Sequence, residues 1–395
     1  MVGRKKNYRE GYRGKIIEMI LENGFIPTAA LRLFDPPTST MYQRSARRMK
    51  EEGCLQELKT ISGNKYLRLT DEGARLIKET LPEDDKELYH DPKVKAALRY
   101  LGMTDVDKER KIAYKMQQDK FYNDVAAKLF SQIAGIETES VPELNEREID
   151  SDSAAYYDSA KVKRLGSFRA DLSESKKLMN SRINGLVISP GGVYSVYNTG
   201  KTVPEWKKDG ETKMASSIQA LIGRSMREYS ATSYDKEAVI ISKKDSNFVR
   251  IMQGEGRKGK FRRTLMNIDT AYERMYAIPY THDGVKLFKI MQQDGWQGNV
   301  KTQILSAEEI EESNYVSVAC DGYDRREGIY KLVFCIPNMS KLKAFSKRAG
   351  IEENRDKYHV YCYKSQLPIV APMIGDNAKV FAIDIDDMCM ELDIE

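Results

Sequence analysis

The side chains of this chain that could do chemistry are mostly basic and polar groups rather than nucleophiles or metal ligands. The five cysteines stand singly without a CxxC pair, and the three histidines lack the neighbours that a catalytic triad or a zinc site requires. We therefore expect no catalytic residue, no metal site and no cofactor. The chemistry that the sequence favours is the binding of a polyanion.

Positive charge is concentrated near the N-terminus of the 395-residue chain, whose formal net charge is +5. Residues 1–80 hold 16 Lys and Arg against 10 Asp and Glu, whereas the rest of the chain is nearly balanced. A small basic domain beside a nearly neutral body is typical of a nucleic-acid-binding protein. A merely solvated basic surface has the same composition and stays an alternative.

The first 81 residues predict a winged helix-turn-helix domain. Apolar residues recur at helical spacing, Pro36-Pro37 must end the second helix, and the turn-forming residues 62–64 (SGN) separate two strands. Helix, helix, turn, helix, hairpin and helix is the element order of this fold. The expected helices cover 16–23, 28–34, 38–53 and 71–81, and the expected strands cover 55–60 and 66–70.

Two stretches of this domain carry a family resemblance. Residues 45–53 (SARRMKEEG) and 66–74 (YLRLTDEGA) resemble the N-terminal module of the replication-relaxation proteins of plasmids and conjugative elements. The resemblance implies that the third helix enters the major groove of DNA while the wing touches the backbone. A winged helix used only for protein contacts is the alternative.

The third helix has an apolar face with Tyr42, Ala46 and Met49 and a polar face that can meet DNA. Side chains of the polar face would read base edges or contact phosphates, and the wing would add phosphate contacts. The expected groove residues are Thr40, Gln43, Arg44 and Arg47, the expected phosphate contacts are Arg48 and Lys50, and the expected wing residues are Lys59, Asn64 and Lys65.

The middle of the chain predicts a linker and a long helix. Residues 82–107 are expected to link the head to a body over 108–395, because their start is polar and flanked by prolines. Tyr122, Ala126 and Phe130 then recur at helical spacing, which predicts an amphipathic helix in the core of the second domain. A helix that joins two copies of the chain is the alternative.

The body predicts an α/β fold with a mixed, largely parallel sheet. Continuous apolar strands alternate with helices, and residues 189–192 (SPGG) form a clear hairpin turn. The acidic stretch from 384 to the C-terminus is expected to be a last strand that leads into an acidic tail. The expected strands are 181–188, 193–197, 238–241, 275–278, 331–336 and 358–363, and the expected helices are 211–229, 247–252, 285–291, 340–349 and 366–374.

The family resemblance implies a restriction-endonuclease-like body, in which acids on a hairpin hold Mg²⁺. Here Asn184 and the triplet 197–199 (YNT) stand at those places, and amides and phenols do not supply the charge that a hard cation needs. We therefore expect a catalytically inactive platform. A displaced metal site formed by Asp171, Glu174 and Glu211 is the alternative.

A second basic stretch lies in the body. From 243 to 263 there are eight basic residues and two acids, and glycines are interspersed among them. Such a loop suits phosphate contacts, although a solvated loop explains it equally well. The residues expected to contact DNA here are Arg257, Lys258, Lys260, Arg262 and Arg263.

These features together favour a sequence-specific DNA-binding accessory or regulatory protein of a mobile element, acting in plasmid replication or conjugative transfer. Double-stranded DNA is the expected partner, with a relaxase or replication protein, or a second copy of the chain, on the body. The alternatives are a metal-dependent DNA nuclease and a transcriptional repressor. The absence of a signal-peptide-like or membrane-spanning apolar segment favours a cytoplasmic protein that does not enter the membrane.

Overall fold

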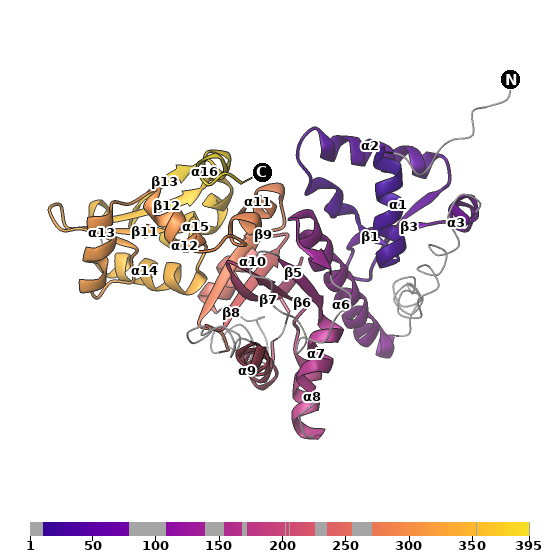
Figure 1. Cartoon of the computed structure of the whole chain (residues 1–395), viewed down its shortest axis with the longest axis horizontal. Helices are drawn as coiled ribbons and strands as arrows, with labels where there is room; N and C mark the ends of the chain where they lie inside the picture. The colour runs from indigo at the N-terminus through magenta and orange to yellow at the C-terminus, as the bar shows by residue number, and fades with distance from the viewer. Residues whose placement is uncertain are drawn as a thin grey trace. The chain divides into compact units, whose positions relative to one another are not determined.

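The computed structural model divides the chain into a first unit, Met1–Ile133, and a second unit, Ala134–Glu395, which we describe separately (Figure 1). Both helices and mixed sheets are present, so the expected α/β class is confirmed. The structure describes residues 11–78, 108–138, 154–167, 172–201, 203–204, 206–225, 235–254, 271–352 and 354–394.

The first unit contains a three-stranded antiparallel sheet with the order β1-β3-β2. Its elements are α1 (Gly11–Asn23), β1 (Ile26–Pro27), the 3-10 helix η1 (Thr28–Arg32), α2 (Thr38–Glu51), β2 (Leu55–Lys59), β3 (Lys65–Leu69), α3 (Asp71–Lys78) and α6 (Lys108–Ile133).

The N-terminal elements follow the predicted order with two changes, the first of which is the added short strand β1 that pairs with β3. Helix α1 buries Ile16 and Ile20 and ends at Asn23, where Gly24 adopts a φ of 77°. The expected second α-helix is instead the short 3-10 helix η1, in which the Leu33 amide donates to the Ala30 carbonyl at 3.0 Å. The segment is a short connector that ends before Pro36, and 3-10 helices are frequent in short connectors.

Helix α6 packs within the first unit, whereas we expected the helix over 108–135 in the second domain. Its Tyr122 is 1% exposed and stacks near Phe25 with ring centroids 6.4 Å apart. The Gln118 side chain accepts a hydrogen bond from the Ile61 amide in the hairpin loop at 2.7 Å. The apolar stripe of α6 thus predicts that one face of the helix is buried, but it does not specify the domain against which that face packs. The expected linker, 82–107, lies outside the described residues.

The second unit begins with a six-stranded mixed sheet with the order β4-β5-β6-β7-β8-β9. The middle strands β5, β6 and β7 form an antiparallel meander, and β8 and β9 continue the sheet in parallel. The strands are β4 (Glu137–Thr138), β5 (Ala155–Asp158), β6 (Gly185–Ser189), β7 (Gly192–Gly200), β8 (Glu237–Ser242) and β9 (Arg274–Pro279), and the helices among them are α7 (Ser159–Ser167), α8 (Leu172–Asn180), α9 (Lys208–Ser225) and α10 (Asp245–Gln253).

The remaining strands form a second sheet with the order β10-β11-β12-β13, so the single sheet that we expected is in fact two. Pairing is parallel from β11 to β13 and antiparallel between β10 and β11. The elements are α11 (His282–Ile290), α12 (Trp296–Thr302), α13 (Ala307–Glu312), β10 (Gly322–Asp324), β11 (Ile329–Val333), α14 (Met339–Glu352), β12 (Tyr358–Tyr363), α15 (Leu367–Ile374), β13 (Lys379–Ile383) and α16 (Ile385–Glu391), with short 3-10 turns at Ser313–Tyr315, Arg355–Lys357 and Lys364–Gln366.

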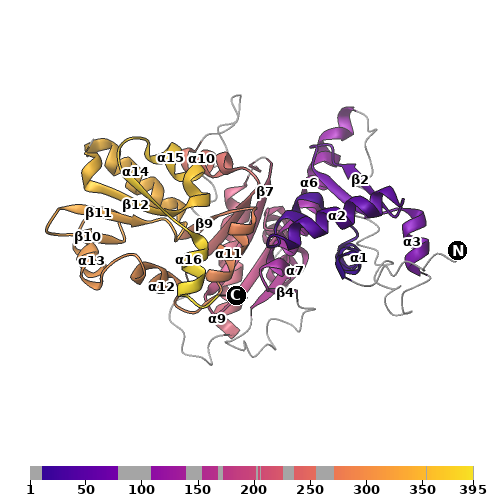
Figure 2. The same ribbon diagram turned by 90° about the horizontal axis from the view of Figure 1, so that it is seen from above.

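One hydrophobic core joins the two sheets of the second unit. Phe248 of α10, Phe345 of α14 and Ile369 of α15 are each fully buried in it. Figure 2 shows α10, α14 and α15 gathered together where the two sheets approach each other. Side chains from both sheets therefore belong to one continuous core.

The C-terminal residues form a helix rather than the expected strand and tail. Strand β13 ends at Ile383, and the Asp384 carboxylate then accepts the Asp386 amide at 3.1 Å and caps α16. Carboxylates at a helix N-terminus satisfy free amides and stabilise the helix dipole. The acids that we interpreted as a tail thus serve as a helix start.

All five cysteines are buried, and none of them forms a disulfide bond. Cys54 lies in the first unit and the other four lie in the second, where burial raises the pKa of Cys362 to about 12. A thiol in such surroundings stays protonated and packs as a small apolar side chain.

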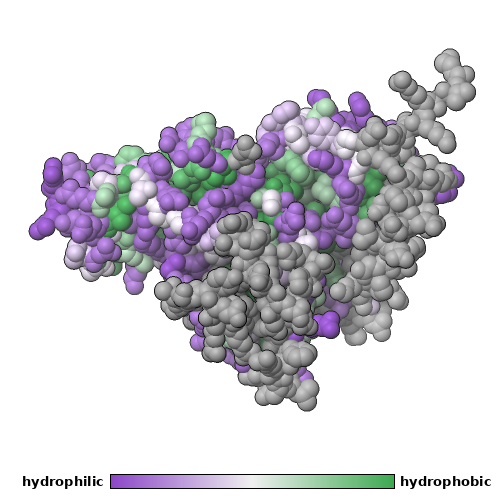
Figure 3. Space-filling view, in the orientation of Figure 1, coloured by the Kyte–Doolittle hydropathy of each residue, from purple (hydrophilic) through white to green (hydrophobic). Residues whose placement is uncertain are grey.

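The surface is largely hydrophilic over the part of the second unit that contains β10 to β13, with small apolar patches between (Figure 3). Among the described residues, no helix has the length and apolar character needed to cross a membrane.

Candidate functional site

Helix α2 has two chemically different faces, as predicted. The buried face consists of Ser39, Tyr42, Ala46 and Met49, which recur at the spacing of one helix side. The opposite face carries the exposed residues Thr40, Gln43, Arg44, Arg47, Arg48 and Lys50. The structure therefore brings all six expected helix residues to the solvent side of one helix.

The cations of this face are weakly held by the protein. Arg47 pairs with Glu51 at 3.0 Å, but the two side chains are 80% and 60% exposed, so solvent screens the pair. Arg44 and Arg48 form no ion pair with the described residues. Such guanidinium groups can change partner at little cost, as contact with phosphate requires.

Lys50 and Lys65 share one carboxylate. The Glu57 oxygens lie 3.3 Å from Lys50 Nζ and 2.9 Å from Lys65 Nζ. The hydrogen bond from Lys65 is the largest cause that lowers the pKa of Glu57 below its ordinary value. This bridge ties the end of α2 to the hairpin, so the two expected groups of contacts belong to one continuous surface.

The hairpin residues behave differently from one another. Lys59 and Lys65 are exposed and pair across the strands, as expected of wing residues. Asn64, however, is 4% exposed, and its amide donates to the Asp119 carboxylate of α6 at 3.3 Å. In this structure the Asn64 side chain therefore contacts α6, whereas Lys59 and Lys65 face solvent.

Sequence reasoning missed the residues that hold the hairpin loop. Ser62 donates to Asp119 at 2.6 Å, and Gln118 accepts the Ile61 amide. Polar residues on a helix carry no periodic signal that names their partner, so only the fold could place Gln118 and Asp119 at the loop. Of the body residues, Arg257, Lys258, Lys260, Arg262 and Arg263 lie outside the described residues.

A buried polar cluster surrounds Glu211 in the first turn of α9. Its carboxylate accepts hydrogen bonds from Ser181 Oγ at 2.7 Å, from the Arg182 amide at 2.8 Å and from Tyr197 OH at 2.6 Å. The Tyr197 hydroxyl also lies 2.7 Å from the Tyr272 hydroxyl. Burial raises the pKa of Glu211, and the three hydrogen bonds partly offset this effect.

The cluster gives Glu211 a structural role. A carboxylate that accepts three protein hydrogen bonds in a fully buried position has its oxygens already directed at protein donors. Of the other residues of the expected displaced metal site, Asp171 lies outside the described residues, as does the side chain of Glu174. Among the described residues, no three His, Cys, Asp or Glu side chains form a group that could hold a metal ion.

Asn184 and Asn198 lie side by side at one end of the β6–β7 hairpin. The Asn184 side-chain oxygen accepts a hydrogen bond from the backbone amide of Asn198 at 2.6 Å. The Asn198 side-chain oxygen accepts one from the backbone amide of Gly200 at 2.8 Å. Both asparagines are buried, at 5% and 3% exposed. The side chains of the two asparagines therefore hold the backbone in place where β7 ends.

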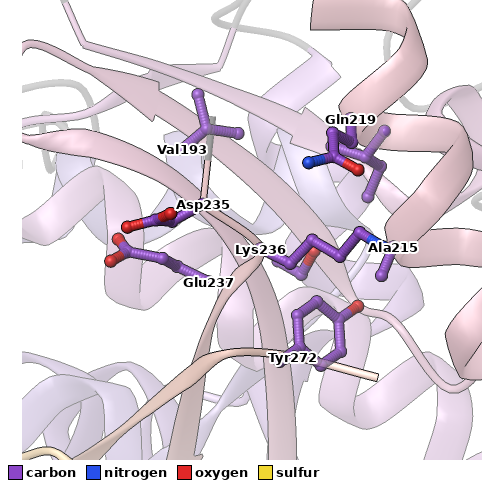
Figure 4. A pocket seen from close by; sticks show the side chains of 9 residues that line it. Val193, Ala215, Gln219, Asp235, Lys236, Glu237 and Tyr272 are labelled. Atoms are coloured by element: carbon purple, nitrogen blue, oxygen red, sulfur yellow. The ribbon is translucent and has the colours of Figure 1, made fainter. Parts of the chain in front are cut away.

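The second unit also contains a small pocket between α9 and the first residues of β8 (Figure 4). Asp235 and Glu237 point to one side of the chain and Lys236 to the other, as alternate residues of a strand do. Arg274 pairs with both acids and lies 2.8 Å from Glu237. The pocket is lined by Val193, Ser195, Ala215, Ile218, Gln219, Asp235, Lys236, Glu237 and Tyr272.

Comparisons with protein-family models, with curated proteins and with solved structures find no match.

Proposed function

We propose that this protein is a sequence-specific DNA-binding accessory or regulatory protein of a mobile element, acting in plasmid replication or conjugative transfer. The observation that carries the proposal is the exposed, weakly paired basic face of α2, with Arg44, Arg47 and Arg48 on it. An exposed helix of this kind can enter the major groove, where arginine reads guanine and backbone phosphates anchor the protein.

The first unit acts as a winged helix-turn-helix in this proposal. Element order, the β1-β3-β2 sheet and the bridge from Lys50 through Glu57 to Lys65 all support it. In that arrangement α2 is the recognition helix and the β2–β3 hairpin is the wing. Lys59 and Lys65 then supply backbone contacts from the wing.

The second unit acts as a restriction-endonuclease-like platform that cuts nothing. The antiparallel meander β5–β6–β7, followed by α9 and the parallel strand β8, supports such a body. Asn184 and Asn198 occupy the hairpin end with hydrogen-bonded amides in place of acids. Its surface would bind a relaxase, a replication protein or a second copy of the chain.

The test is duplex binding by the full chain. Fluorescence anisotropy with random and locus-derived duplexes should show binding that weakens steeply with salt and favours the native locus. A footprint at a replication or transfer origin would support the accessory role, whereas one at a promoter would support a repressor. Undetectable binding to every duplex in dilute buffer would refute the proposal.

The nuclease alternative has its own test. Supercoiled plasmid is incubated with the protein and Mg²⁺ or Mn²⁺, and the Glu211→Gln variant is assayed beside it. Because the Glu211 carboxylate is held by Ser181, Arg182 and Tyr197, we expect no nicking by either protein. Nicking that Glu211→Gln abolishes would instead favour the nuclease.

A further inference from the structure

Three hydrogen-bond donors of the hairpin loop converge on two side chains of α6. The Ile61 amide donates to Gln118, and the Ser62 hydroxyl and the Asn64 side-chain amide donate to the two oxygens of Asp119. The distances are 2.7 Å, 2.6 Å and 3.3 Å in that order. Figure 2 shows α6 next to β2.

These donors are of the kinds that bind phosphate in protein–DNA complexes. Backbone amides, hydroxyls and side-chain amides fix the phosphodiester backbone, and lysines add charge. Lys59 and Lys65 lie directly opposite each other where the two strands meet the loop; both are exposed, and the Lys65 ammonium contacts Glu57. The loop therefore combines three neutral donors with two cations.

The group that faces these donors is itself an anion. The Asp119 carboxylate presents two oxygens to the loop, much as a phosphodiester presents its two unesterified oxygens. We propose that the hairpin loop is a binding site for a DNA backbone phosphate and that Asp119 of α6 occupies it in this structure. This inference rests on the proposed function, because it requires that the first unit binds DNA.

The consequence is competition between α6 and DNA. A phosphate that binds the loop must displace Asp119, since one set of donors cannot satisfy both anions. Until it moves, Asp119 also repels an approaching phosphate. The affinity of the protein for DNA is then lowered by the fraction of molecules in which α6 covers the loop.

The first experiment removes the competing charge. The full-length Asp119→Asn variant should bind a random-sequence duplex about three- to tenfold more tightly at low salt, with the gain shrinking as salt rises. Asp124→Asn is the matched control, because it removes the same charge from α6 about 140° around the helix. Ser62→Ala in the Asp119→Asn background should reverse the gain, since it removes a donor.

A second measurement needs no variant and thus does not depend on how Asp119→Asn folds. Amide hydrogen exchange over residues 115–121 should accelerate when the wild-type protein binds the duplex, because α6 then releases the loop. Unaltered exchange there, or affinity of Asp119→Asn equal to or below that of the control, would overturn the loop site. Failure of the wild type to bind any duplex would instead refute the proposed function itself.

Discussion

The basic face of α2 and the cluster around Glu211 are two polar regions of the molecule in which charged side chains have opposite surroundings. Arg44 and Arg47 face solvent and depend little on the protein, whereas the Glu211 carboxylate is buried and fully engaged by Ser181, Arg182 and Tyr197. Exposed charge is available to a partner, while buried charge is committed to the fold. Changes in the first region should therefore alter binding, and changes in the second should alter stability.

The largest effect is expected from reversing charge on α2. Arg44→Glu combined with Arg47→Glu should weaken duplex binding by about three orders of magnitude, because two phosphate attractions become repulsions. The melting temperature should stay within about 2 °C of wild type, since both side chains are exposed. Fluorescence anisotropy measures the duplex affinity, and thermal denaturation measures the melting temperature. Undiminished affinity would remove α2 from the proposed interface.

Truncating the buried carboxylate should give the converse result. Glu211→Ala leaves Ser181, Tyr197 and the Arg182 amide without their acceptor, so the free energy of unfolding should fall by about 3 kcal/mol. Urea denaturation measures this loss. The duplex affinity of the folded fraction should match that of wild type. A loss of affinity without a loss of stability would show that Glu211 serves binding rather than the fold.

A smaller effect is expected from the basic loop of the body. Replacing Arg257, Lys258, Lys260, Arg262 and Arg263 by Gln should weaken binding about tenfold and flatten its salt dependence. The slope should fall by about 0.9 for each phosphate that the loop no longer neutralises. Titration of affinity against salt concentration measures the slope. An unchanged slope would mean that these residues are only a solvated surface.

The smallest effect concerns pH. Because burial raises the pKa of Glu211 above the ordinary 4.5, the folded state binds this proton more tightly than the unfolded state. The contribution of Glu211 to wild-type stability should therefore fall as pH rises from about 4.5 through the raised pKa. Glu211→Gln lacks this titration, so its stability relative to wild type should improve across that interval. Denaturation curves at several pH values measure the stability difference between the variant and wild type. A difference that does not change with pH would contradict a raised pKa for Glu211.

Strong periodicity made most elements predictable from the sequence. The strand expected over 358–363 matches β12, and the helix expected over 38–53 differs from α2 only at its end. Alternation of apolar and polar residues and turn-forming glycines and prolines encode such elements locally. The polar face of α2 follows from the same pattern, which is why its six candidate residues are all exposed.

Long-range features were not predictable in this way. Nothing in the apolar stripe around Tyr122 specifies that α6 packs in the first unit, and nothing in the strand pattern specifies that β10 to β13 form their own sheet. The burial of Asn64 depends on Asp119, which is 55 residues away in sequence. Short helices such as α16 were missed because capping by Asp384 outweighed the strand-like pattern before it.

The distribution of the buried cysteines equips each unit with its own built-in reporter. Cys54 is the single thiol of the first unit, and the other four belong to the second, so mass spectrometry of alkylated peptides resolves the two. A thiol reagent reaches such groups only when the surrounding structure opens. The labelling rates of Cys54 and Cys362 then compare how often each unit opens locally, within one unmodified molecule.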